Sequence, residues 1–156
     1  MASAGRLLEQ AIAAGHDVTA VARNPQKLPG ELPGQVSVVT ADLAAPDQAT
    51  LESAVEGADA VLSGLGPTSN SEAGVATQGT RAIAAAMKAT GAQRIIVVSA
   101  APIGTVPSPG RPNPPRHDPG DGFLMRHLGA PLTKAAFRKH YADLAQMEDI
   151  LRDRPR

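Results

Sequence analysis

Arg94-Ile-Ile-Val-Val-Ser-Ala-Ala101 is the stretch that decides the fold, because it is the strongest strand signal in the chain. A run of consecutive apolar residues is typical of a strand buried on both faces, as in parallel sheets. Three shorter runs of the same kind lie upstream, at 18–22, 36–40 and 60–64. The sequence therefore predicts four strands.

Helical patterns alternate with these strands. A first helix carries Leu7 and Ile12 and ends at Gly15, and a second is capped by Asp47 and ends before Gly57. Two longer helices are predicted from apolar residues at helical spacing. The first carries Val75, Gly79, Ile83 and Met87 and ends at Gly91, and the last runs from about Thr133 to Arg152 with Phe137, Tyr141, Leu144, Met147 and Leu151 along one stripe.

This alternation predicts an α/β fold, a Rossmann-like doubly wound parallel sheet with helices on both faces. We expect one domain over residues 1–156 that is incomplete, because a helix comes first where such a sheet begins with a central strand. The last helix likewise has no strand after it. Prolines and glycines predict an irregular loop over 102–122, which is either mobile or covers a ligand, and a short helix is predicted over 123–128.

Composition narrows the function classes. Fifteen basic residues balance fifteen acidic ones, and aromatic residues make up only 2%. We therefore expect neither a nucleic-acid partner nor a membrane partner. There is no cysteine, and no His–carboxylate spacing fits a metal site, so no metal is predicted. A cytoplasmic setting is the expectation.

Four stretches of the chain resemble the atypical short-chain dehydrogenase/reductase group, the NmrA-like and biliverdin-reductase-B-like NAD(P)H-binding proteins. The first is Ala4-Gly-Arg-Leu-Leu8 followed by the segment 14–27. The others are Thr40-Ala-Asp-Leu43, Asp59-Ala-Val-Leu-Ser-Gly-Leu-Gly66 and Ile95-Ile-Val-Val-Ser-Ala-Ala101. The final helix, at 141–151, is also similar to the last helix of that group. The order and spacing of the stretches carry the resemblance.

The resemblance implies a dinucleotide phosphate site at the N-terminus of the first helix. Family members have a G-x-x-G-x-x-G turn there, of which this chain retains only the last glycine, Gly5. Ser3, Ala4 and Gly5 would lie nearest the phosphates, where a helix N-terminus favours anions. From the residues alone, Gly5 is better explained as part of a frayed chain end, and only the match of the downstream segments favours the phosphate site.

The residues after the next two strands are implied to hold the adenosine end of the cofactor. Arg23, with Lys27, would meet the 2′-phosphate of NADP, so NADP(H) is preferred over NAD(H). Asp42 and Leu43 would lie beside the adenine. Taken without the resemblance, Arg23 is as well explained as a solvated strand-end residue and Asp42 as a turn residue.

The remaining site residues follow the third and fourth strands and lie in the last helix. Gly64, Leu65 and Gly66 are expected at the cofactor, and they also fit a tight turn. Ser99 would contact the cofactor and orient a substrate carbonyl, with Tyr141 or His140 as the proton donor. Position 145 is alanine where a lysine would complete the usual Tyr-x-x-x-Lys pair. Packing in the apolar stripe is therefore the other explanation of Tyr141, and a surface position that of His140.

Three readings of function follow. The first is an NADPH-dependent oxidoreductase acting on a small carbonyl, quinone or flavin-like substrate. The second is a non-catalytic NADP(H)-binding sensor of the NmrA-like kind. The third is a truncated, inactive fragment, because a missing central strand would leave backbone groups unpaired at a cost of about 1–3 kcal/mol each.

Overall fold

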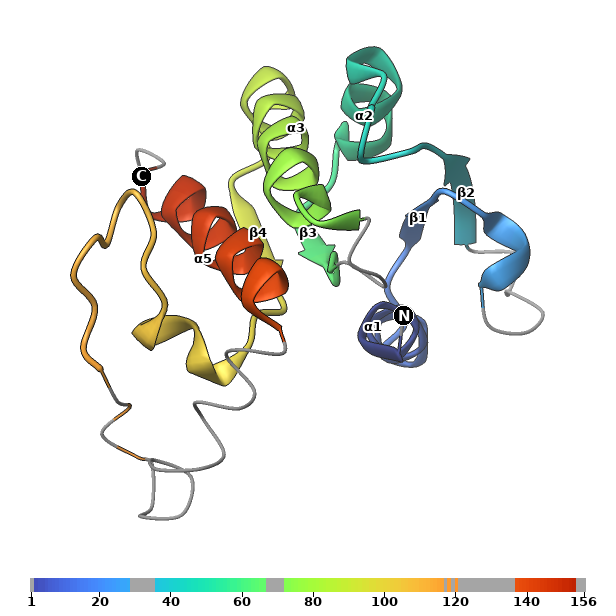
Figure 1. Ribbon diagram of the computed structural model, residues 1–156. Coiled ribbons are helices and arrows are strands. Elements are labelled where there is room, and N and C mark those ends of the chain that lie inside the picture. Colours follow the sequence, from blue (N-terminus) through green and yellow to red (C-terminus); the bar gives the residue numbers. More distant parts are fainter. Residues whose placement is uncertain are drawn as a thin grey trace. The chain divides into compact units, whose positions relative to one another are not determined.

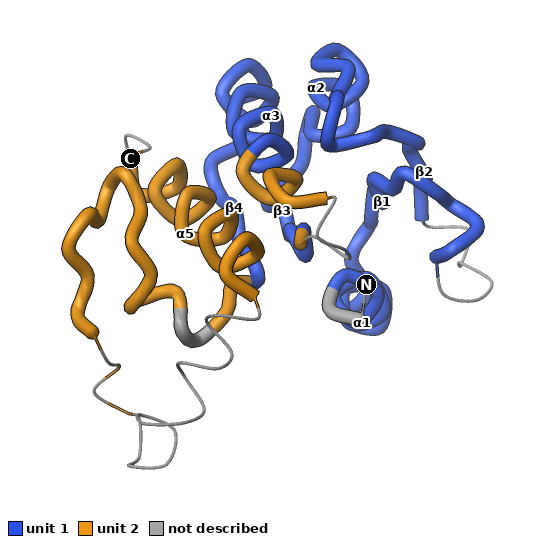
Figure 2. The backbone as a smooth tube through the Cα atoms, in the orientation of Figure 1, with its two compact units in different colours: residues 1–65, 78–98 blue, residues 66–77, 99–156 orange. Residues whose placement is uncertain are grey.

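The computed structural model describes residues 2–28, 36–66, 72–116, 118, 120 and 137–153. This part of the chain divides into two compact units (Figure 2). Unit 1 comprises residues 1–65 and 78–98, and unit 2 comprises residues 66–77 and 99–156. The predicted short helix at 123–128 and the start of the last helix, at 133–136, lie outside the described residues.

Unit 1 holds the helix–strand alternation (Figure 1). Helix α1 (Ala2–Ala13) leads into strand β1 (Val18–Ala22), and the 3-10 helix η1 (Pro25–Lys27) follows. Strand β2 (Val36–Thr40), helix α2 (Gln48–Val55), strand β3 (Ala60–Ser63), helix α3 (Val75–Thr90) and strand β4 (Arg94–Val97) come next in the chain. The first three residues of α3 belong to unit 2. The α/β class predicted from the sequence is confirmed.

The helix ends follow the predicted chemistry. Asp47 caps α2, and its side chain accepts a hydrogen bond from the backbone N–H of Thr50. Gly15, Gly57 and Gly91 each follow a helix with φ of +79°, +73° and +81°. These are left-handed conformations that glycine adopts without steric cost, so the helices end where the sequence predicts.

The strands form two parallel pairs. In the first, Val18 of β1 is in register with Val36 of β2, and in the second, Ala60 of β3 with Arg94 of β4. Within the described residues no ladder joins β1 to β3, so each of these strands has one partner strand (Figure 1). The parallel pairing is that of a doubly wound sheet.

A single core in unit 1 receives side chains from both strand pairs. Its buried members are Ala41, Leu51, Val55, Ala82, Ile83, Ala86 and Met87, with Val21, Val61 and Ile95 of the strands packed against them. The opposite face is less covered than the apolar runs predict. Leu62 and Ile96, which are register partners, are 44% and 52% exposed. The expectation of burial on both faces is therefore wrong at these two positions.

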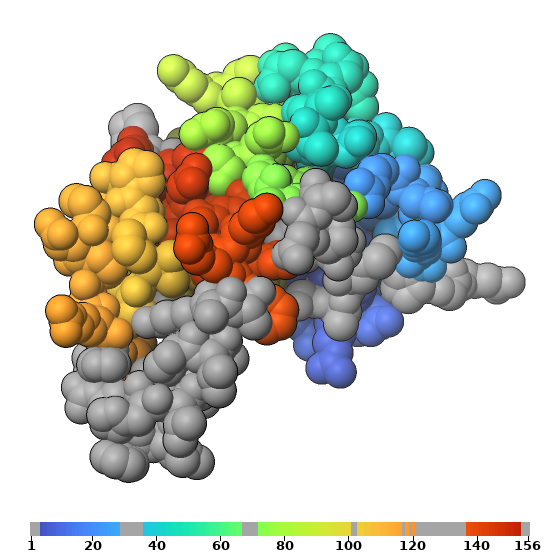
Figure 3. Space-filling view, in the orientation of Figure 1, coloured from blue at the N-terminus to red at the C-terminus, as the bar shows by residue number. Residues whose placement is uncertain are grey.

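Unit 2 contains helix α5 (Arg138–Arg152) and the 3-10 helix η3 (Ala101–Thr105). The fourth strand ends at Val97, four residues before the predicted end, because the chain turns into η3 at Ala101. The described residues of the 102–122 segment include a tight turn in which Ser108 and Arg111 exchange backbone hydrogen bonds. In the space-filling view this segment, yellow to orange, lies against α5, red (Figure 3).

The buried side of α5 differs from the predicted apolar stripe. Phe137 is 49% exposed, whereas Asp143, Ala145, Met147 and Asp149 are buried. Asp143 is buried because it caps another helix. Its carboxylate accepts hydrogen bonds from the backbone N–H groups of Ala76 (3.1 Å) and Thr77 (2.9 Å), at the start of α3. No helix in the described part of the chain is long and apolar enough to span a membrane.

Candidate functional site

The N-terminus of α1 lies against the carboxyl end of β3. A Cβ atom placed on Gly64 would lie 2.9 Å from the Cα, Cβ and N atoms of Ala4. A contact this close requires a residue without a side chain at position 64. The structure therefore brings together two of the predicted cofactor segments, one from the first helix and one from the third strand.

The first turn of α1 suits an anion. The leading N–H groups of a helix have no partner within it, and the helix dipole favours negative charge there. The first turn of α1 contains no acidic side chain. A Cβ atom on Gly5 or on Gly66 would meet no atom within 4 Å, so the backbone at both glycines is open to close approach. These features fit the pyrophosphate of a dinucleotide.

The predicted adenosine residues follow β1 and β2. Arg23 comes directly after β1 and is exposed, as is Lys27 at the end of η1. Asp42 is exposed and accepts a hydrogen bond from the N–H of Ala44 at 3.0 Å, which is a turn contact. Asp42 thus stabilises a turn through Oδ1, and its Oδ2 atom takes no part in that hydrogen bond.

Leu43 and Leu65 both pack against α3 at Gly79. A Cβ atom on Gly79 would lie 2.7 Å from Cδ1 of Leu65 and 3.2 Å from Cβ of Leu43. The glycine in α3 thus lets the segments after β2 and β3 approach the same turn of the helix. The sequence shows Gly79 only as a member of an apolar face, and its role in seating the site segments is evident only in the structure.

The three predicted catalytic residues are not joined in one cluster. Ser99 follows β4 by two residues, and its hydroxyl donates to Oε1 of Glu148 at 2.7 Å. Glu148 lies seven residues beyond Tyr141 in α5, about 10 Å along the helix axis. Among the described residues, no hydrogen bond links Ser99 to His140 or Tyr141. The rings of both residues instead lie near that of Phe137, at centroid distances of 5.9 and 6.1 Å.

His140 and Ala145, which bear on proton transfer, both lie in α5. The Nδ1 atom of His140 is buried and has no hydrogen-bond partner in the described structure. Ala145 is 2% exposed, so the position of the usual lysine is part of the packed side of the helix. Glu148 is the polar residue that the sequence reasoning missed. Its spacing from Ser99 carries no signal, because the two residues are 49 positions apart.

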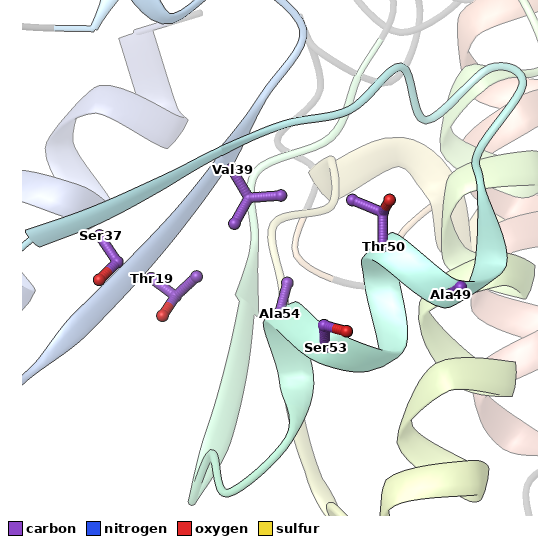
Figure 4. A pocket seen from close by; sticks show the side chains of 7 residues that line it. All are labelled: Thr19, Ser37, Val39, Ala49, Thr50, Ser53 and Ala54. Atoms are coloured by element: carbon purple, nitrogen blue, oxygen red, sulfur yellow. The ribbon is translucent and has the colours of Figure 1, made fainter.

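A hollow of about 550 Å³ lies elsewhere in unit 1, beside the β1–β2 pair and α2 (Figure 4). It is lined by Thr19, Ser37, Val39, Ala49, Thr50, Ser53 and Ala54. None of these residues is charged, and none is a predicted site residue. The hollow therefore lacks the cations and glycines that a dinucleotide phosphate requires.

Parallel strand pairs, with glycine-rich and polar segments at their carboxyl ends and a helix N-terminus beside them, define a Rossmann-like dinucleotide-binding domain. The sequence matches the NAD(P)H-binding family over residues 2–155. The chain belongs to this family, which confirms the NAD(P)H-binding family to which the resemblance pointed.

Solved structures agree with this assignment. A Rossmann-fold NAD(P)-binding family protein from Shigella flexneri is 25% identical, with a TM-score of 0.50 over 65% of this chain and 47% of that one. A short-chain dehydrogenase/reductase from Veillonella parvula, in complex with NADP, has 19% identity and a TM-score of 0.63, over 96% of this chain and 58% of that one. The chain thus spans about half the length of these two proteins. At 19% identity, the similarity to the Veillonella parvula protein concerns the fold alone.

Proposed function

We propose that this chain binds NADP(H) and takes part in the NADPH-dependent reduction of a small carbonyl, quinone or flavin-like substrate. The observation that carries the proposal is the contact of Ala4 with Gly64, which sets the first turn of α1 beside the carboxyl end of β3. Dinucleotide pyrophosphates bind at such a helix N-terminus in this fold.

Each predicted residue has a defined role in this proposal. The backbone of Ser3, Ala4 and Gly5, together with Gly64 and Gly66, would hold the pyrophosphate. Arg23, assisted by Lys27, would bind the 2′-phosphate, because the planar guanidinium donors match phosphate oxygens. When bound, the cofactor would supply the hydride, and the protein would supply position and electrostatics.

The adenine and substrate ends are assigned by strand order. Asp42 and Leu43, after β2, would flank the adenine, and Leu65 would line the space next to the phosphates. Ser99, after β4, would lie toward the nicotinamide end. His140 and Tyr141 remain candidate proton donors, and water can deliver the proton if neither does. We further propose a cytoplasmic setting, from the absence of cysteine.

A second candidate is a non-catalytic NADP(H) sensor. It is favoured by the buried Ala145 at the position of the usual lysine, and by the engagement of the Ser99 hydroxyl with Glu148. Neither feature prevents cofactor binding, but both remove parts of the usual proton-transfer arrangement.

Turnover separates the two candidates. NADPH oxidation by the purified chain would be followed with quinone, flavin and aldehyde acceptors, after NADPH binding has been measured by calorimetry. The oxidoreductase predicts oxidation that depends on the acceptor and saturates with NADPH. Binding without oxidation by any acceptor would support the sensor instead, and absence of binding would contradict both.

A further inference from the structure

Arg6 is a charged residue of α1 to which the proposed function gives no role. It is exposed, and it is the fifth residue of the helix, which begins at Ala2. Glu9 lies three residues further along the helix, within reach of an ion pair. Within the residues that the structure describes, however, the side chain of Arg6 has neither an ion pair nor a hydrogen bond. Its guanidinium is therefore available to a ligand.

Arg6 lies on the side of α1 that faces away from the packed residues of unit 1. Ala4 lies against Gly64, and Leu8, one turn beyond Ala4, is 8% exposed. Arg6 is two positions from each of them, which is about half a turn around the helix. Helical side chains slope back toward the N-terminus, and position 6 is only about 6 Å beyond Ala2 along the axis. The long side chain of Arg6 is therefore directed toward the first turn.

The charge of Arg6 does not favour the helix itself. The N-terminus is the positive end of the helix dipole, so negative groups stabilise it and a cation nearby does not. The first turn of α1 contains no acidic side chain that could offset this charge. Arg6 thus adds positive charge to an end of the helix that is already positive. A local departure from what stabilises a helix is expected where a residue serves a ligand, and here the ligand must be an anion.

We infer that Arg6 is a cofactor-binding residue, whose guanidinium pairs with the pyrophosphate on the side of α1 away from β3. The inference rests on the proposed function, in which the first turn of α1 holds that pyrophosphate. Gly5 leaves space for this contact, because a Cβ atom there would meet no atom within 4 Å. NADPH and NADH share the pyrophosphate, so Arg6 contributes equally to the binding of both, whereas Arg23 is proposed to distinguish them.

The test compares Arg6→Gln with Arg81→Gln, which makes the same change at an exposed arginine within α3. The dissociation constants of NADPH and NADH are measured by calorimetry at low ionic strength. Arg6→Gln is expected to weaken the binding of both cofactors by the same factor, about threefold to tenfold. Arg6→Lys should retain most of the affinity, because a phosphate also accepts a point charge. Arg81→Gln should bind both cofactors as the wild type does.

Denaturant unfolding of the chain without cofactor separates a binding role from a structural one. Arg6→Gln should be at least as stable as the wild type, because it removes a cation near the helix N-terminus. A less stable Arg6→Gln would overturn the inference, since Arg6 would then support the helix. Unchanged affinities, or a loss confined to NADPH, would also overturn it while the proposed function stands. Absence of binding of either cofactor by the wild-type chain would overturn both.

Discussion

Gly64 and Ala4 are in backbone contact, and a side chain at position 64 would lie 2.9 Å from the Cα of Ala4. The contact places the first turn of α1 at the carboxyl end of β3, although sixty positions separate the two residues in the chain. It is the feature of the fold on which the proposed cofactor site depends.

Gly64→Ala should therefore destabilise unit 1. Because the nearest atoms are backbone, the added methyl cannot be accommodated by a rotamer change, and overpacking of this kind costs about 1–3 kcal/mol. Denaturant unfolding measures the loss. Gly66→Ala is the matched control, because its added methyl meets no atom within 4 Å. Equal stabilities of the two variants would show that the contact is not tight.

Gly5→Ala should have opposite effects on the apo chain and on the complex. Alanine favours the helical state over glycine by about 0.5–1 kcal/mol, and the site in α1 is sterically open, so the apo chain should become more stable. NADP(H) affinity should fall, because a methyl would stand where the backbone approaches the phosphates. Denaturant unfolding measures the stability of the variant, and calorimetry measures its NADP(H) affinity. An increase in both stability and affinity would show that Gly5 does not contact the cofactor.

Asp143→Ala should destabilise unit 2 by about 1.5–3 kcal/mol, since it leaves the buried N–H groups of Ala76 and Thr77 without their charged acceptor. Asp143→Asn should cost less, because the amide oxygen still accepts one of the two bonds. Asp153→Asn is the exposed control. If Asp143→Ala unfolds at the same denaturant concentration as the control, Asp143 does not act as a cap.

The start of α2 should depend on pH. The hydrogen bonds from Thr50 hold the pKa of Asp47 below its ordinary value. Ionised Asp47 therefore contributes stability above the pKa of the unfolded chain, and this contribution is lost as the pH falls through the lower, folded-state pKa. The protection factor of the Thr50 amide against hydrogen exchange, which corrects for the intrinsic effect of pH, should fall in acid in the wild type, whereas Asp47→Asn should show a flatter profile. Parallel profiles would contradict the assignment.

Much of unit 1 can be predicted from sequence, because its signals are local. The strands at 18–22 and 36–40 have the predicted bounds, and the glycines at 15, 57 and 91 end helices as expected. Local signals predict the helix α5 and its end at Arg152, but not which of its side chains are buried. Asp143 and Asp149 are buried there because of partners 66 and 39 residues away, and no periodicity reports such partners. The predicted stripe of apolar residues consequently assigned Phe137 to the buried side.

The candidate site, too, can be predicted from sequence only in part. Glycines after a strand and an arginine at a strand end are visible in sequence. The contact of Gly64 with Ala4 supports the grouping of the first-helix segment with the segment after the third strand. The state of Ser99 could not be predicted. Its residue type suggests a donor to a ligand, and only the structure shows that Glu148 already accepts its proton.

The most direct test of the account is calorimetric titration of the chain with NADPH and with NADH, in the wild type and in Arg23→Ala. Thermal unfolding in parallel would check that the chain unfolds cooperatively and that a bound cofactor raises its melting temperature. The account predicts tighter binding of NADPH than of NADH, and loss of about tenfold in NADPH affinity in Arg23→Ala with little change for NADH. Equal affinities for the two cofactors, or no binding by the wild-type chain, would contradict it.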